Sequence, residues 1–279
     1  MENPAKNANL DPNLSRRLYS ALTIGPEGIY QVLDDPSMEV LFALLKNPAL
    51  NDNHLLALLN RRDLSEDLLK AVCRLGKVAG SHELTVALVR NPRVPGALLA
   101  SLLPRLYLFE LVEICYLPGV TPDQKIAAER TIIQRLPTTP LGNKITLARR
   151  GTAAIAEALI RDSDSRLMEA CLSSPHLKES AVFKFLSSAN ATAETISMVA
   201  RHPRWKGRVN LQLAILKNQK TPAVWFTLFL PHLGLADVKG LLLSQRLTAS
   251  QKKLVVEELK RRGQFIRGVQ LSGISSPLK

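Results

Sequence analysis

The feature that most constrains this fold is a sequence pattern that is repeated from about Leu14 to Arg262. Each instance is an apolar run with helical spacing, a short break that often contains Asn-Pro, and a second run opened by a capping residue or by Pro. The intervals between breaks vary, so the sequence alone indicates a degenerate repeat with no strict period. The breaks are Lys46-Asn47-Pro48, Arg90-Asn91-Pro92, Leu117-Pro118-Gly119, Arg150-Gly151-Thr152, Ser173-Ser174-Pro175, Arg201-His202-Pro203 and Lys217-Asn218-Gln219.

The starts of several helices can be located from capping residues. Thr121 with Gln124, and Thr248 with Gln251, match the capping box, in which the two side chains satisfy backbone N–H groups of a new helix. The chain has 17 prolines spread along its length, many at or close to the breaks, and alternating strand-like runs are scarce. These observations predict many short helices, and therefore an all-α fold.

Short helices with a broad apolar face cannot bury that face alone, whereas pairs that stack on one another form a continuous core. The pattern therefore predicts an α-solenoid of short helix pairs, with a compact irregular helical bundle as the alternative. We expect an N-terminal tail over 1–13, a single domain over 14–262 that has a basic end from about 201, and a flexible C-terminal tail over 263–279.

Three phrases carry a resemblance to known families: Leu44-Leu45-Lys46-Asn47-Pro48, Leu88-Val89-Arg90-Asn91-Pro92-Arg93-Val94-Pro95 and Ile215-Leu216-Lys217-Asn218-Gln219-Lys220-Thr221-Pro222. They resemble bacterial leucine-rich repeat variant and HEAT-like proteins. The resemblance implies a right-handed stack of short helices and a non-catalytic interaction surface. Some leucine-rich repeat variant proteins carry an iron–sulfur cluster on a segment of clustered cysteines. This chain lacks such a segment, so the cluster is not carried over.

Residues that usually carry catalytic or metal chemistry are dispersed along the chain. Cys73, Cys115 and Cys171 are too far apart in sequence for a Cys-x-x-Cys metal site, and each is expected to be a small buried apolar residue. The five histidines form no His-x-x-x-His pattern, and no Gly-rich phosphate loop is present. Asp162-Ser163-Asp164 begins like a calcium loop but lacks the later ligands, so we interpret it as a helix cap. We therefore expect no cofactor, no metal and no enzymatic activity.

One enzymatic alternative comes from the HEAT-like resemblance. Some HEAT-like solenoids are DNA glycosylases that use a basic concave face with a carboxylate and tryptophans. Trp205, Trp225 and Asp237 are the conceivable counterparts here, although no motif supports assigning them.

Positive charge is concentrated near the C-terminus. The net charge is +13, and residues 201–279 hold 15 basic and 3 acidic side chains. This asymmetry indicates an anionic partner, although cations near helix C-termini can equally form a solvated face that opposes the helix dipole. Trp205 lies within the densest stretch and could stack on a base, or belong to the core. The candidate partner- or nucleic-acid-binding residues are Arg201, Arg204, Trp205, Lys206, Arg208, Lys217 and Lys220.

The first residues lack the apolar core of a signal peptide, and no stretch is long and apolar enough for a membrane helix. We therefore expect a soluble, cytoplasmic protein without a membrane span. The function we expect is that of a scaffold or adaptor that binds a protein partner through a helical repeat surface. The alternative is a protein that binds nucleic acid or another polyanion through the basic segment 201–262.

Overall fold

The computed structural model describes residues 11–162 and 164–264, and every regular element in these ranges is helical. The all-α prediction is therefore confirmed for this part of the chain. None of the helices in these ranges has both the length and the apolar character needed to cross a membrane. The residues expected to form a single domain fall into two compact units, Met1–Gln134 (unit 1) and Arg135–Lys279 (unit 2).

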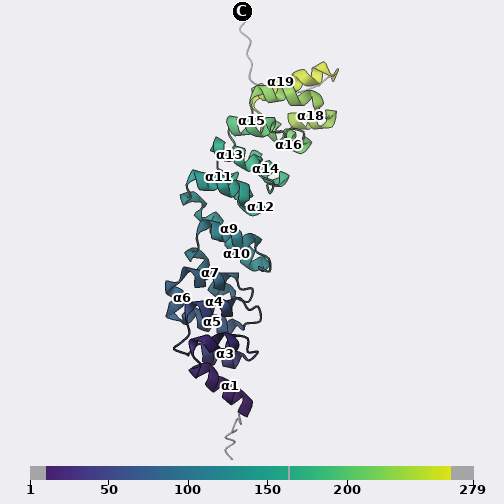
Figure 1. Cartoon of the computed structure of the whole chain (residues 1–279). Coiled ribbons are helices and arrows are strands. Elements are labelled where there is room, and N and C mark those ends of the chain that lie inside the picture. The colour runs from purple at the N-terminus through teal and green to yellow at the C-terminus, as the bar shows by residue number, and fades with distance from the viewer. Residues whose placement is uncertain (1–10, 163, 265–279) are drawn as a thin grey trace, which may run out of the picture. The chain divides into compact units, whose positions relative to one another are not determined.

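Unit 1 is built from short helices that pack on helices of the next pair (Figure 1). Helix α1 packs on α3 and α3 on α5, while α2 packs on α4 and α4 on α7. The elements are α1 (Pro12–Thr23), η1 (Pro26–Gly28), α2 (Ile29–Leu33), α3 (Met38–Leu44), α4 (Asp52–Leu59), α5 (Glu66–Arg74), α6 (Gly76–Gly80), α7 (His82–Arg90), α8 (Gly96–Leu102), η2 (Leu103–Arg105), α9 (Leu108–Tyr116) and α10 (Pro122–Arg135), where η denotes a 3-10 helix.

Unit 2 has the same kind of packing. Helix α11 packs on α13 and α13 on α15, α14 packs on α16, and α17 packs on α19. The elements are η3 (Leu136–Thr138), α11 (Leu141–Arg150), α12 (Ala153–Leu159), α13 (Ser165–Leu172), α14 (Glu179–Leu186), α15 (Ala193–Arg201), α16 (Val209–Leu216), α17 (Ala223–Phe229), η4 (Leu230–His232), α18 (Leu235–Leu242) and α19 (Ala249–Arg261).

The ends of the described chain differ slightly from those expected. Helix α1 begins at Pro12, because the Asp11 side chain accepts a hydrogen bond from the backbone N–H of Asn13 and caps the helix there. Residues 12 and 13 are thus helical and not part of a tail. Gly263 follows α19 with a φ of 71°, a left-handed conformation that favours glycine. Beyond Gln264, the expected C-terminal tail lies outside the described residues, as do residues 1–10.

The two units share one plan in a constant register. Helices α3, α4, α5, α7, α8, α9 and α10 correspond in order to α13, α14, α15, α16, α17, α18 and α19, and within the described ranges every such pair of helix starts has the same offset in sequence. The 3-10 helices η2 and η4 follow the same offset, and we call this correspondence the inter-unit register. Within each unit the spacing of successive helix starts still varies, as expected for a degenerate repeat, and the constant offset between the units is a longer correspondence that sequence reasoning did not find. Two pairs of the breaks follow this register: Lys46-Asn47-Pro48 corresponds to Ser173-Ser174-Pro175, and Arg90-Asn91-Pro92 corresponds to Lys217-Asn218-Gln219.

The Asn residues of two breaks explain part of this regularity. Nδ2 of Asn91 donates hydrogen bonds to the carbonyl oxygens of Leu59 (3.0 Å) and Arg61 (2.8 Å), at the end of α4. Asn218 is the equivalent residue in the inter-unit register, and its Nδ2 donates to the carbonyl of Leu186 (2.7 Å) at the end of α14. The last carbonyls of a helix have no partner within that helix. Each Asn therefore caps a helix of the preceding pair and joins the two pairs.

A glutamine continues the same chain of bonds in both units. Nε2 of Gln124 donates to the carbonyl of Asn91 (2.7 Å), and Nε2 of Gln251 donates to the carbonyl of Asn218 (3.3 Å). The side-chain oxygens of these glutamines also complete both predicted capping boxes. Asn and Gln at these positions therefore connect the end of α4, the end of α7 and the start of α10 in unit 1, and the ends of α14 and α16 and the start of α19 in unit 2.

One equivalent position lacks this connection, and it gives a prediction about stability. Nδ2 of Asn47 donates to the carbonyls of Ala21 (2.9 Å) and Ile24 (3.0 Å). Ser174 stands at the equivalent position of unit 2, where it is buried and its hydroxyl has no hydrogen-bond partner among the described residues. We expect Ser174→Asn to raise the free energy of unfolding by about 1 kcal/mol, measured by urea denaturation. An unchanged or lower value would contradict the equivalence of the two positions.

Candidate binding groove

Two residues of the predicted basic site form part of the internal structure of unit 2. The side chain of Trp205 is only 3% exposed, and its Nε1 donates to the carbonyl of Leu172 at 3.0 Å. The guanidinium of Arg204 lies 4.3 Å from the centre of the Trp205 ring and donates to the carbonyls of Ser174 (2.5 Å) and Leu177 (2.9 Å). The ring is enclosed in this arrangement, so it presents no face on which a base could stack.

The other five predicted residues divide into cations with internal partners and cations without. Arg208 lies 3.8 Å from the carboxylate of Glu179, Arg201 donates to a carbonyl of its own helix, and Nζ of Lys220 donates to the carbonyl of Ala189 at 2.8 Å. Lys206 and Lys217 are exposed and form no ion pair with any carboxylate of the described residues. The predicted set is therefore not one converging surface.

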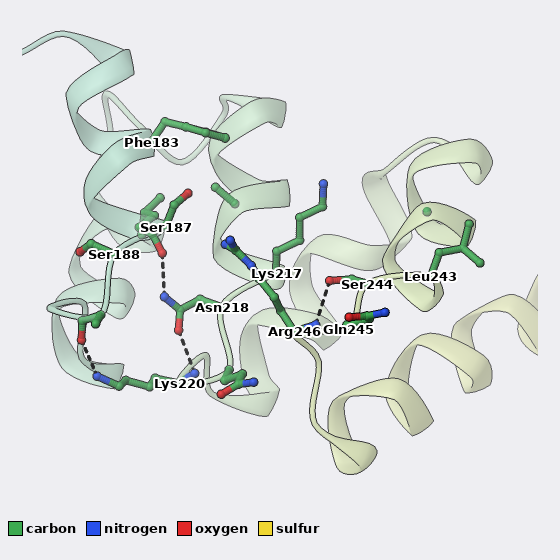
Figure 2. A pocket seen from close by; sticks show the side chains of 15 residues that line it. Phe183, Ser187, Ser188, Lys217, Asn218, Lys220, Leu243, Ser244, Gln245 and Arg246 are labelled. Atoms are coloured by element: carbon green, nitrogen blue, oxygen red, sulfur yellow. Dashed lines mark hydrogen bonds between the residues drawn. The ribbon is translucent and has the colours of Figure 1, made fainter. Parts of the chain in front are cut away.

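Lys217 does line an open pocket, which we call the α14–α18 groove. The groove has a volume of about 1090 Å³ and lies where α14, α16 and α18 end (Figure 2). Besides Lys217, its cations are Lys220 and Arg246, and its remaining polar side chains are Ser, Asn and Gln. None of its lining residues is acidic. The lining of the groove therefore carries positive charge.

Two large apolar side chains border these cations. Leu243 is 86% exposed and Phe183 is 46% exposed, and both line the groove. In Figure 2, Lys217 and Arg246 lie between Ser187 and Leu243. The exposed leucine therefore lies beside cations that form no ion pair within the described chain. Burying an apolar side chain of this size against a partner is energetically favourable, so this surface is suited to binding.

Sequence reasoning missed Arg246 and Leu243. Arg246 has no basic residue among its near neighbours in sequence, so a search for dense positive charge passes over it. Leu243 directly follows the apolar end of α18 and has the pattern of a core residue. For Arg246 the signal that could have found it is the inter-unit register, because it aligns this residue with Gly119 in a second groove.

That second groove, the α4–α9 groove, lies at the equivalent place in unit 1 and has a volume of about 590 Å³. Several of its lining residues have equivalents in the α14–α18 groove, including Leu59 with Leu186, Arg90 with Lys217, and Asn91 with Asn218. Its charge differs, however, because Glu83 and Glu110 line it together with its cations, and Glu110 lies 2.7 Å from Nε2 of His82. The residues that line the groove thus carry mixed charge in unit 1 and only positive charge in unit 2.

Cys115 and Cys171 lack the properties of nucleophiles. Burial raises the pKa of the Cys115 thiol to about 11 and that of Cys171 to about 12. Both therefore stay protonated at neutral pH, and the thiolate is the reactive form. Cys73 is only half-buried, unlike the buried residue expected from the sequence. In residues 11–162 and 164–264, no group of three or more His, Cys, Asp or Glu side chains could hold a metal ion.

The tryptophans that suggested a glycosylase alternative are both buried. Trp225 is 8% exposed, its Nε1 donates to Oγ of Ser197 at 2.9 Å, and its ring packs against Phe229 with the centroids 5.5 Å apart. Trp205 is enclosed as described above. Neither side chain is placed to contact an extruded base.

Comparison of the chain with protein-family models, with characterised proteins and with solved structures finds no match. The resemblance to leucine-rich repeat variant and HEAT-like proteins therefore stays a prediction.

Proposed function

We propose that this protein is a non-catalytic α-solenoid scaffold that binds a protein partner in the α14–α18 groove. The observation that carries the proposal is the combination of the highly exposed Leu243 with Lys217 and Arg246, which form no ion pair within the described chain, in one open groove. Such a surface can bury apolar area and pair charges at once, which is how protein interfaces commonly combine affinity with specificity.

The bonding pattern supports a solenoid. In a stack of repeats, each helix pair contacts only its neighbours, and the core is continuous along the stack. Asn91 and Asn218 donate to carbonyls of residues that precede them by 32 positions, which is about one helix pair. Packing of α1 on α3 on α5, and of α11 on α13 on α15, follows the same rule. These features favour the solenoid over an irregular bundle.

A protein partner fits the groove better than a nucleic acid does. Trp205, the expected stacking residue, is buried. The exposed Leu243 offers a contact for an apolar side chain rather than for a phosphate or a base. Binding of nucleic acid through 201–262 remains the alternative, and it requires affinity that falls steeply with salt concentration.

Proteins captured from a native lysate by the wild-type chain and by Leu243→Asp test this function. We expect the substitution to reduce recovery of specific partners by about tenfold or more, because a charged side chain would replace the apolar anchor. Leu228→Asp is the matched control, since Leu228 is 50% exposed and does not line the groove. Equal recovery with Leu243→Asp and wild type would contradict the proposal, and recovery that depends on nucleic acid in the lysate would favour the alternative.

A further inference from the structure

This inference rests on the proposed function and specifies the chemistry of the partner. We propose that the α14–α18 groove binds an acidic segment of a partner protein, and that one carboxylate of the segment pairs with Lys217 in the space above Gly240. The adjacent Leu243 receives an apolar side chain of the same segment.

The argument begins with an ion pair in unit 1. Arg90, at the end of α7, lies 3.3 Å from the carboxylate of Glu113 on α9. In unit 2 the cation is kept, since Lys217 is the equivalent of Arg90 in the inter-unit register. The anion is lost, because Gly240 stands at the position of Glu113. Lys217 therefore occupies the position at which Arg90 pairs with Glu113, but it has no carboxylate at the position of Glu113.

The missing carboxylate leaves room for one from a partner. A Cβ atom added to Gly240 would meet no other atom within 4 Å, so the surface above this glycine is open. Glycine within a helix costs about 1 kcal/mol relative to alanine, and α18 has it in its interior. The open space can take a neutral side chain, whereas a carboxylate placed there would compete with the partner for Lys217.

The rest of the groove favours the same occupant. Arg246 and Lys220 add positive charge, and the groove has no acidic lining residue that would repel a carboxylate. Leu243 lies three residues after Gly240, a spacing that places two side chains on one helical face. Its exposed fraction is 86%, against 48% for Tyr116 at the equivalent position of unit 1. An acidic segment that also carries apolar residues complements both features.

The test uses the full chain and a fluorescein-labelled peptide of alternating Glu and Leu, with binding measured by fluorescence anisotropy. Peptides of alternating Gln and Leu, and of alternating Lys and Leu, serve as probes of charge. We expect only the Glu-Leu peptide to bind measurably. Gly240→Glu is expected to weaken its binding at least tenfold, because the new carboxylate can pair with Lys217 as Glu113 pairs with Arg90.

Two control variants separate charge at this position from other effects. Glutamine has nearly the same size and helix propensity as glutamate but no charge. Gly240→Gln is therefore expected to retain peptide binding within about twofold. Lys253→Glu reduces the net charge on α19, outside the groove, and is also expected to retain binding. Equal losses with Gly240→Gln and Gly240→Glu, or a comparable loss with Lys253→Glu, would overturn the inference.

The outcomes also distinguish this inference from the proposed function. If the Glu-Leu peptide does not bind while Leu243→Asp still loses partners from the lysate, the scaffold function stands and the acidic segment is wrong. If a single-stranded oligothymidylate binds the chain and Gly240→Glu weakens it as much as it weakens the peptide, the groove accepts polyanions in general and the inference is overturned.

Discussion

Trp205→Ala is expected to lower the free energy of unfolding by about 3–5 kcal/mol, the range for removing a large buried aromatic side chain. The indole is 3% exposed, so its loss leaves a cavity in unit 2. The substitution also removes the donor to the carbonyl of Leu172 and the ring under the guanidinium of Arg204. Urea denaturation followed by near-ultraviolet circular dichroism measures the change.

Trp205→Phe separates the two contributions. It keeps an aromatic ring but removes Nε1, and it is expected to cost about 1–2 kcal/mol because the Leu172 carbonyl then lacks its donor. Val78, at the equivalent position of unit 1, is also buried, which identifies this as a core position in both units. If Trp205→Ala lowers the free energy of unfolding by less than about 1 kcal/mol, the result would contradict the burial of Trp205 and favour a role in stacking on a base.

The same residue shows a limit of sequence reasoning. A tryptophan next to arginine in a basic stretch is typical both of a nucleic-acid surface and of an internal cation–π contact. What distinguishes them is whether the indole and the guanidinium find partners within the chain. Here Arg204 donates to two carbonyls that lie 27 and 30 residues earlier in the sequence. Such partners come from packing, and no local pattern around Arg204 indicates them.

The helical content was predictable because it depends on local signals. Both Thr-x-x-Gln capping boxes are present. Asp164 caps α13 by accepting hydrogen bonds from backbone N–H groups, which confirms that this stretch of sequence contains a helix cap. The inter-unit register was missed because equivalent positions often differ in residue type, as Asn47 and Ser174 do. Packing conserves the place of a helix more strictly than the identity of its residues.

The groove was also beyond local reasoning. Its lining comes from the ends of α14, α16 and α18, which are separated by intervening helices in the sequence. Lys217 was found because it lies in a dense basic stretch, whereas Arg246 and Leu243 have no such marker. The inference that Lys217 lacks a carboxylate partner depends on comparing Gly240 with Glu113. That comparison requires the inter-unit register, which comes from the structure.

The second large effect is expected for Asn91→Leu, which should lower the free energy of unfolding by about 3 kcal/mol, since each buried polar group left unsatisfied costs about 1–3 kcal/mol. Asn91 is 2% exposed, and its side chain donates to the carbonyls of Leu59 and Arg61. Leucine has a similar size but no donor, so two carbonyls at a helix end lose their partner.

Asn218→Leu is the matched comparison, and its loss is expected to be about 1 kcal/mol. Asn218 is half-buried, and among the described residues its Nδ2 donates to one carbonyl, that of Leu186. Urea denaturation of both variants measures the difference. Equal losses for the two variants would mean that burial of the amide does not determine the loss of stability. A loss for Asn91→Leu as small as that of an average surface substitution would mean that the hydrogen bonds of Asn91 do not hold neighbouring helix pairs together.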